Sequence, residues 1–224
     1  MAPRAQTLGA DDGPQQSAAE RAYVFVKQQI LSGGYPGGVL ISEGEVSAAV
    51  RVSRTPVREA FLRLEVEGLL KLYPKRGALV TPVSASEIRE VLDARLAIER
   101  HAVRTAIGNR QHRELAARLR AILGEHEVPG RPRDPGLFTQ VDQQFHRTLV
   151  DAAGNRLLAD FYATLRDRQL RMGTAALLRD PGRYGKILAE HAALAELIDD
   201  GDVEAVAEAL AAHLAATRAT LSGV

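Results

Sequence analysis

The chain has 224 residues, with 29 Lys and Arg against 28 Asp and Glu, so its formal net charge is only +1. This length allows two domains with separate cores, and the balanced charge excludes a protein that binds nucleic acid over its whole surface. No apolar run approaches the roughly 18 residues that span a bilayer, so no membrane partner is expected. The chain lacks cysteine, which excludes disulfides and thiolate metal sites and agrees with a reducing compartment.

The N-terminal segment, residues 1–18, has neither the apolar stretch of a signal peptide nor helical periodicity. It therefore predicts a disordered tail, and we expect the chain to stay in the cytoplasm. Helical spacing of apolar residues then predicts one helix over 19–31, ended by Gly33, and a second over 42–50.

The run SRTPVREAFLRLEVEGLL, which begins at Ser53, predicts a helix that presents arginines. Ser53 suits the N-cap, and Gly68 is placed to end the helix. Arg54 and Arg58 are four residues apart, so both lie on one side near the N-terminal end. A guanidinium can donate two hydrogen bonds to a guanine in the major groove, which favours a DNA recognition helix. The alternative is an ordinary amphipathic surface helix with solvated arginines.

The flanking segments favour DNA binding. Two short runs of strand-forming residues, 69–73 and 78–81, enclose a basic tip at Lys75 and Arg76, which is typical of a hairpin wing. Together with the preceding helices, they predict a winged helix-turn-helix over residues 19–82. Nine basic residues against six acidic ones give this block a charge of +3, so the positive charge gathers where phosphate would be met.

The rest of the chain predicts helices alone. We interpret residues 83–86 as a linker and residues 87–224 as an all-α domain. Glycine, proline and capping residues mark the breaks between about six helices. Their expected spans are 85–107, 112–125, 135–152, 156–178, 181–199 and 202–221. The predicted fold is therefore mainly α, with a winged helix-turn-helix followed by a helical bundle.

Four polar side chains interrupt the apolar faces of three of these helices. Asp142 and His146 lie four apart in or beside the apolar stripe of the helix 135–152, while His191 and His213 fall within the apolar faces of the last two helices. Burying an unpaired carboxylate is very unfavourable, and a divalent metal would compensate it. Nitrogen and oxygen donors suit zinc first, with nickel, manganese or iron as alternatives. Hydrogen-bonded core histidines are the competing interpretation.

Arg95 and Glu99 interrupt the inner face of the helix 85–107 in the same way. One interpretation is a buried ion pair between residues four apart. The other is an effector site, in which Arg95 faces a cavity and binds a carboxylate bidentately, with Glu99 beside it. One of three arginines on a later helix is also expected to line that cavity. They are Arg166, Arg168 and Arg171.

The pattern ILSGGYPGGVLISEGEVSAAVRVSRTPVREAFLRLEVEGLLKLYPKRGALV resembles the GntR family of bacterial transcription regulators over residues 19–82. The resemblance implies that Arg54, Thr55 and Arg58 contact bases and phosphates, and that Gly77 is the wing glycine that enters the minor groove. Arg51 stands where the family usually has a turn glycine. The complete expected DNA-binding set is Ser53, Arg54, Thr55, Arg58, Lys75, Arg76 and Gly77.

The elements DQQFHRTLVDAAGN, ILAEHAALAELIDDGD and AAHLAAT resemble the effector-binding FCD domain over about residues 86–221. In metal-containing members, the ligands map onto Asp142, His146, His191 and His213, and this chain has all four. An arginine near the metal recurs at the position of Arg95. The resemblance implies a homodimeric repressor that binds an inverted-repeat DNA operator and responds to a small carboxylate.

Two other functions stay open at this stage. A metal with open positions could belong to an enzyme with an appended DNA-binding domain, although Glu99 is the only clear general base. Four protein ligands also exceed the usual three of catalytic zinc, so we do not expect an enzyme. The third function is a constitutive repressor whose metal is structural.

Overall fold

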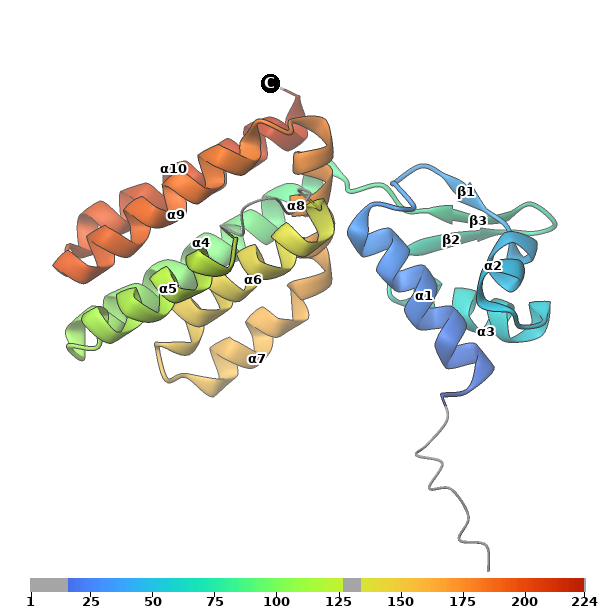
Figure 1. Cartoon of the computed structure of the whole chain (residues 1–224), viewed down its shortest axis with the longest axis horizontal. Helices are drawn as coiled ribbons and strands as arrows, with labels where there is room; N and C mark the ends of the chain where they lie inside the picture. Colours follow the sequence, from blue (N-terminus) through green and yellow to red (C-terminus); the bar gives the residue numbers. More distant parts are fainter. Residues whose placement is uncertain (1–15, 127–133, 224) are drawn as a thin grey trace, which may run out of the picture. The chain divides into compact units, whose positions relative to one another are not determined.

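The structure, a computed structural model, describes residues 16–126 and 134–223 and divides into two compact units. The first unit joins the described part of residues 1–27 with 40–79, and the second joins 28–39 with the described part of 80–224. Figure 1 labels the helices and strands of both. Most of the predicted tail lies outside the described residues, and the first helix begins at Ala18.

The first unit contains the predicted winged helix-turn-helix. It contains α1 (Ala18–Ser32) up to residue 27, α2 (Glu43–Val50), α3 (Arg54–Val66), β1 (Leu40–Ile41), β2 (Leu70–Tyr73) and β3 (Gly77–Val80) up to residue 79. The sheet order is β1-β3-β2, with Leu40 opposite Leu79 in an antiparallel register. Strand β1 was not predicted, because two residues are too few to show an alternating pattern.

The turn between α2 and α3 depends on local backbone chemistry. Ser42 and Glu45 form a reciprocal capping box at the start of α2. Arg51, which ends α2, has φ of 56° and ψ of 52°, so it adopts the left-handed conformation that the family's usual glycine would take. The turn therefore keeps its geometry without glycine. On the apolar side of α3, Val57, Phe61 and Leu64 are buried.

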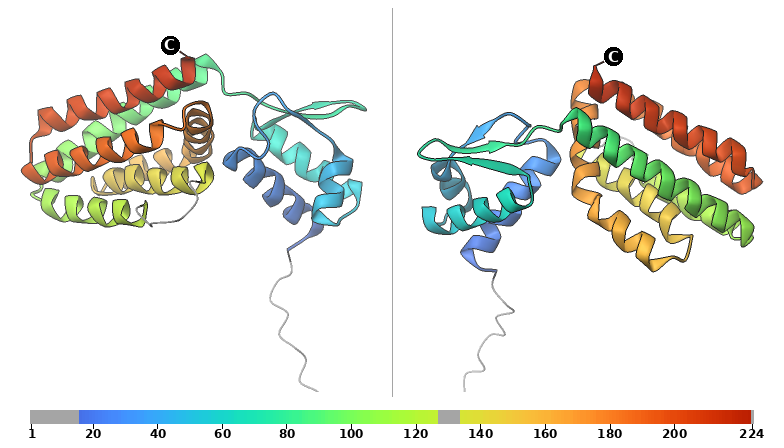
Figure 2. Two further views of the ribbon diagram at one scale, coloured as in Figure 1. Left: turned by 45° about the horizontal axis from the view of Figure 1, so that its top comes forward. Right: turned by 180° about the vertical axis from the view of Figure 1, so that it is seen from behind.

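The second unit is a helical bundle, as predicted. Its helices are α4 (Ala85–Gly108), α5 (His112–His126), α6 (Pro135–Asp151), α7 (Arg156–Thr164), α8 (Arg166–Arg179), α9 (Arg183–Asp200) and α10 (Val203–Ser222). The view from behind in Figure 2 shows α4 along one side of the bundle, with α10 next to it. Among the described residues, no helix combines the length and the apolar character needed to cross a membrane.

One predicted boundary was wrong. The expected single helix 156–178 is divided at Leu165 into α7 and α8, so the described part of the bundle has seven helices where about six were expected. No glycine or proline lies between Arg156 and the break, so the local sequence carries no stop signal. Tyr162 and Leu165 instead pack with Ile98 and Val150 in one buried cluster. Tertiary packing therefore sets this bend.

Candidate metal centre and nucleic-acid interface

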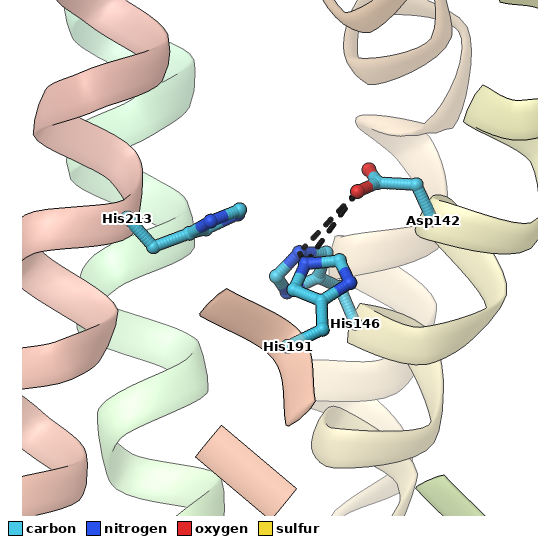
Figure 3. Close-up of side chains that lie close together, drawn as sticks. All are labelled: Asp142, His146, His191 and His213. Atoms are coloured by element: carbon cyan, nitrogen blue, oxygen red, sulfur yellow. Dashed lines mark hydrogen bonds and ion pairs between the residues drawn. The ribbon is translucent and has the colours of Figure 1, made fainter. Parts of the chain in front are cut away.

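Four side chains from three helices converge inside the bundle. Asp142 and His146 come from α6, His191 from α9 and His213 from α10, and Figure 3 shows them facing a common point. One ligand atom of each lies within 4.8 Å of all the others. The structure thus brings together the whole predicted metal set, in which the three histidines are buried and Asp142 is half-buried.

The spacing of the donor atoms of Asp142, His146 and His191 fits one divalent ion. His146 Nε2 lies 3.2 Å from His191 Nε2 and 4.0 Å from Asp142 Oδ1, and His191 Nε2 lies 3.6 Å from the same oxygen. Two atoms that bind one metal at about 2.1 Å stand roughly 3 Å apart at a right angle and about 4 Å apart across it. Nitrogen and carboxylate donors at this spacing therefore suit a metal ion such as zinc.

Two of the histidines each have a carboxylate at the ring nitrogen Nδ1. Glu99 Oε2 lies 2.9 Å from His146 Nδ1, and Glu190 Oε2 lies 2.6 Å from His213 Nδ1. A carboxylate at Nδ1 holds the proton there and leaves Nε2 as the ligand atom. The ring of His191 instead stacks on Phe145, with the centroids 4.1 Å apart.

An arginine pairs with each of these carboxylates. Arg95 Nε donates to Glu99 Oε1 at 2.8 Å, and Arg183 Nη2 donates to Glu190 Oε2 at 2.8 Å. Tyr162 also donates to Glu99 Oε1, at 2.6 Å. The ion pair between Arg95 and Glu99, one of the two interpretations from sequence, is therefore present. Each arginine is connected through its carboxylate to a histidine of the cluster.

The electrostatics of the centre favour a neutral His213 and charged Glu190 and Glu99. Burial lowers the pKa of His213 despite its hydrogen bond to Glu190, so the imidazole stays in the neutral form that binds metal. Burial alone would raise the pKa of Glu190, but His213 and Arg183 outweigh it and lower the pKa to about 2. Burial likewise opposes ionisation of Glu99, yet Arg95 and His146 hold its pKa below the ordinary value.

A small cavity adjoins two of the four side chains. Asp142 and His213 line it together with Arg95, Gln169 and Arg183, and its volume is about 20 Å³, which is room for about one water molecule. Its apolar lining includes Val91, Leu92, Phe138, Met172, Leu177 and Ile187.

Three buried donors on the cavity wall have no protein partner among the described residues. They are Arg95 Nη2, Gln169 Nε2 and Arg183 Nε. All three side chains are buried, so each unpaired N–H group is costly unless another molecule accepts its hydrogen bond. Three donors on one wall are suited to an anion.

Some of these residues were not predicted. Arg166, Arg168 and Arg171, from which a cavity arginine was expected, do not line the cavity, and that expectation was wrong. Arg183 lines it instead, and Glu190 and Gln169 were also missed. The spacing of Arg183 and Glu190 was a usable signal, because residues seven apart on a helix lie on one face. The carboxylate of Glu99 is fully buried between Arg95, His146 and Tyr162, and its predicted role in effector binding stays a prediction.

The predicted DNA contacts gather on the first unit. A hollow of about 730 Å³ between α3 and the wing is lined by Arg54, Arg58, Lys75, Arg76 and Gly77. The two remaining predicted residues are exposed at the start of α3, where Ser53 is the N-cap but its side chain makes no capping hydrogen bond, and Thr55 follows.

Glu43 of α2 holds the central arginine of this surface. Arg58 Nε donates to Glu43 Oε1 at 2.8 Å and Arg58 Nη2 donates to Oε2 at 3.0 Å, although the arginine side chain is 68 % exposed. The bidentate geometry matches the one that a guanine would offer. Glu43 therefore orients the guanidinium while leaving it accessible.

Gly77 is required by the approach of a neighbouring strand. Its φ is 106°, a conformation that favours glycine, and a Cβ atom there would lie 2.3 Å from the carbonyl oxygen of Ile41. Its place at the start of β3 is thus explained by the pairing of β1 with β3. Lys75, at the wing tip, also has positive φ, at 63°.

Comparisons with known proteins agree with both units. Residues 18–80 match the family described as bacterial regulatory proteins, gntR family, and residues 90–216 match the FCD domain. The chain is 28 % identical over 193 residues to the HTH-type transcriptional regulator YdhC of Bacillus subtilis (strain 168), covering 85 % of each. It is also 28 % identical over 211 residues to the HTH-type transcriptional repressor RspR of Escherichia coli (strain K12), covering 93 % of this chain and 90 % of that protein.

The fold has solved counterparts. The structure of E. coli McbR/YncC covers 93 % of this chain and 99 % of its own with a TM-score of 0.65, at 20 % identity. That likeness supports the fold, while the family matches span both units. The chain belongs to the gntR family of bacterial transcriptional regulators and combines its DNA-binding domain with an FCD domain.

Proposed function

We propose that this regulator is a repressor that binds an inverted-repeat operator as a homodimer and releases it when a small carboxylate binds beside a divalent metal in the bundle. The observation that carries the proposal is that Arg95, Gln169 and Arg183, which line the cavity together with Asp142 and His213, each have a buried donor without a partner. Its relative RspR bears the name of a repressor. Since the target is DNA, we place the protein in the bacterial cytoplasm.

Asp142, His146, His191 and His213 would hold the metal. When bound, the ion supplies positive charge and coordination positions for an anionic oxygen. Glu99 and Glu190 would keep two of the imidazoles in the tautomer that presents Nε2.

The charge of the site favours an effector with one negative charge. The pairs Arg95–Glu99 and Arg183–Glu190 each cancel, and the histidines are counted as neutral. Asp142 with a divalent ion leaves a net charge of about +1, which one carboxylate balances. The cavity has room for about one water molecule, so even a short acid would have to displace side chains such as flexible Met172.

DNA recognition would use the hollow between α3 and the wing. Arg54 and Arg58 would read bases in the major groove, while Lys75 and Arg76 would contact phosphates and Gly77 would let the wing approach the minor groove. In a dimer, two such units would bind half-sites about one helical turn apart. The effector can release DNA only if it binds one arrangement of the dimer more tightly than the other.

Calorimetric titration of short carboxylic acids, with and without a chelator, tests the effector proposal. We expect one acid to bind without being consumed, to lose affinity after chelation, and to weaken operator binding reciprocally. Turnover would instead indicate an enzyme, and the absence of binding would indicate a structural metal.

A variant pair makes this test specific for the cavity. Gln169→Leu removes an unpaired donor and keeps a side chain of similar volume. It should weaken acid binding while leaving metal binding unchanged. Gln144→Leu, at an exposed position on α6, is the matched control and should leave both unchanged.

A further inference from the structure

Helix α4 carries an ordered stripe of exposed residues on its outer side. Glu90, Asp93, Ala97, Arg100 and Arg104 are all exposed and follow one another at intervals of three and four residues. This spacing places them in one line along the helix. The stripe runs from two acids through a small residue to two arginines.

The charges of this stripe are segregated in a way that a single helix does not favour. Glu90 and Asp93 are three apart and Arg100 and Arg104 are four apart, so like charges are neighbours in each half. The helix dipole favours acids first and bases last, but only within the terminal turns. Glu90 and Arg104 both lie in the interior of α4, outside its first and last turns.

The four charged side chains are also available for other partners. In the part of the chain that the structure describes, no hydrogen bond or ion pair is recorded for any of them. Glu90 and Arg104 are separated by about 21 Å of helix, too far to reach each other within one copy. Both halves are therefore free to pair with opposite charges on another molecule.

The stripe is complementary to itself. Glu90 and Arg104 lie seven residues on either side of Ala97, while Asp93 lies four before it and Arg100 three after it. If two α4 helices cross in antiparallel orientation at Ala97, the acidic half of each meets the basic half of the other. A two-fold axis gives this relation, because every contact between two residues of different copies then occurs twice, once in each direction. The small side chain of Ala97 allows the two helices to approach closely.

The neighbouring helix offers apolar surface. Leu158, Tyr162 and Leu165, from α7 and its end, form a cluster with Ala94 and Ile98 of α4, so the two helices pack together. On α7, Leu157 is 81 % exposed and Phe161 is 52 % exposed. Exposed aromatic and aliphatic side chains on a helix that packs against α4 are typical of a protein interface.

We propose that α4 forms the two-fold interface of the homodimer, with Ala97 at the axis and Glu90 and Asp93 of each copy facing Arg100 and Arg104 of the other. The inference rests on the dimer of the proposed function and names its surface. The occupant is a second copy of this chain, because the same stripe supplies both complementary halves.

Charge reversal tests the pairing in the full-length protein without DNA. Glu90→Arg and Arg104→Glu should each place like charges together twice and raise the dimer dissociation constant at least about tenfold, measured by analytical ultracentrifugation. Mixing the two variants should restore a dimer, because every pair in the mixed dimer is again opposite in sign. Restoration also shows that both variants are folded. Glu114→Arg, at an exposed position on α5, is the control and should remain dimeric.

A single cysteine tests the position of the axis. The chain has no cysteine of its own, so Ala97→Cys introduces a single thiol, and two such thiols at a two-fold axis are close enough for a disulfide. We expect a covalent dimer under mild oxidation. Ala117→Cys, exposed on α5, is the matched control and should stay uncross-linked.

The outcomes separate this inference from the proposed function. A parent protein that is dimeric, with single variants that dimerise equally well, would overturn the α4 interface and leave the dimeric repressor intact. A parent protein that is monomeric at all concentrations tested would overturn both. Loss of the dimer in both variants with recovery in their mixture would support the interface.

Discussion

The functional charges are exposed in the DNA-binding unit of this regulator and buried in its helical bundle. In the DNA-binding unit, Arg58 is 68 % exposed and its partner Glu43 lies on the neighbouring helix. In the bundle, Glu99 is fully buried between Arg95, His146 and Tyr162. An exposed arginine can exchange a carboxylate for a base, whereas a buried network must be satisfied where it is. The first arrangement suits reversible reading of DNA, and the second fixes a ligand set.

This contrast implies that the same kind of substitution has different consequences in the two units. In the bundle, removal of one charge leaves its partner buried and should affect stability or metal affinity. On the DNA-binding surface, removal of one charge should leave the fold intact and affect DNA affinity alone. Four substitutions, taken from the largest expected effect to the smallest, test this distinction.

Glu99→Ala should have the largest effect. It leaves the buried guanidinium of Arg95 without its counter-ion and His146 without its Nδ1 partner, so we expect the free energy of unfolding to fall by about 3–5 kcal/mol. Urea unfolding of the metal-free protein measures the loss without a contribution from metal binding. Glu196→Ala removes an exposed carboxylate that pairs with Arg120 and should change little. Equal stability of the two variants would show that Arg95 does not depend on Glu99.

The buried network also marks the limit of prediction from sequence. Asp142, His146, His191 and His213 could be predicted because each interrupts an apolar face, and the structure brings all four together. Their metal binding stays a prediction. The pairing of Glu190 with His213 could not be read in the same way, because the pair joins two different helices.

The fold shows the same limit. The helices of the first unit and its wing have local signals, such as the caps at Ser42 and Ser53 and the strand-forming runs beside Gly77. The break at Leu165 has none, since it arises from packing against α4 and α6. Elements that depend on local chemistry were therefore predictable, whereas those that depend on distant contacts were not.

Glu190→Gln should reduce metal affinity by roughly 10- to 100-fold, because it removes the negative charge behind His213 while keeping a hydrogen-bond acceptor. Competition with a chromogenic chelator measures the change. Glu196→Gln, on the same helix but at the surface, is the matched control. If Glu190→Gln bound metal as tightly as its control, His213 would not be a ligand oriented by Glu190.

Arg58→Ala should weaken operator binding by roughly tenfold to a hundredfold and relax the preference for one base, because its guanidinium is oriented for bidentate contact. Fluorescence anisotropy with an operator selected from random DNA, and with single-base variants of it, measures both effects. Arg63→Ala removes an arginine of the same helix that pairs with Glu20 and serves as the control. Unchanged base preference would remove Arg58 from the set of base-reading residues.

Lys75→Asn should have the smallest effect on DNA affinity, and the loss should not depend on the DNA sequence. Lys75 is exposed at the wing tip with φ of 63°, and asparagine tolerates this left-handed conformation, so the wing should keep its shape. Loss of one phosphate contact should weaken binding to all DNA sequences alike and reduce the slope of affinity against salt by about one. Titrations at several salt concentrations with operator and random DNA measure this slope. A selective loss on the operator alone would instead mean that Lys75 reads sequence, and the division of roles between α3 and the wing would then fail.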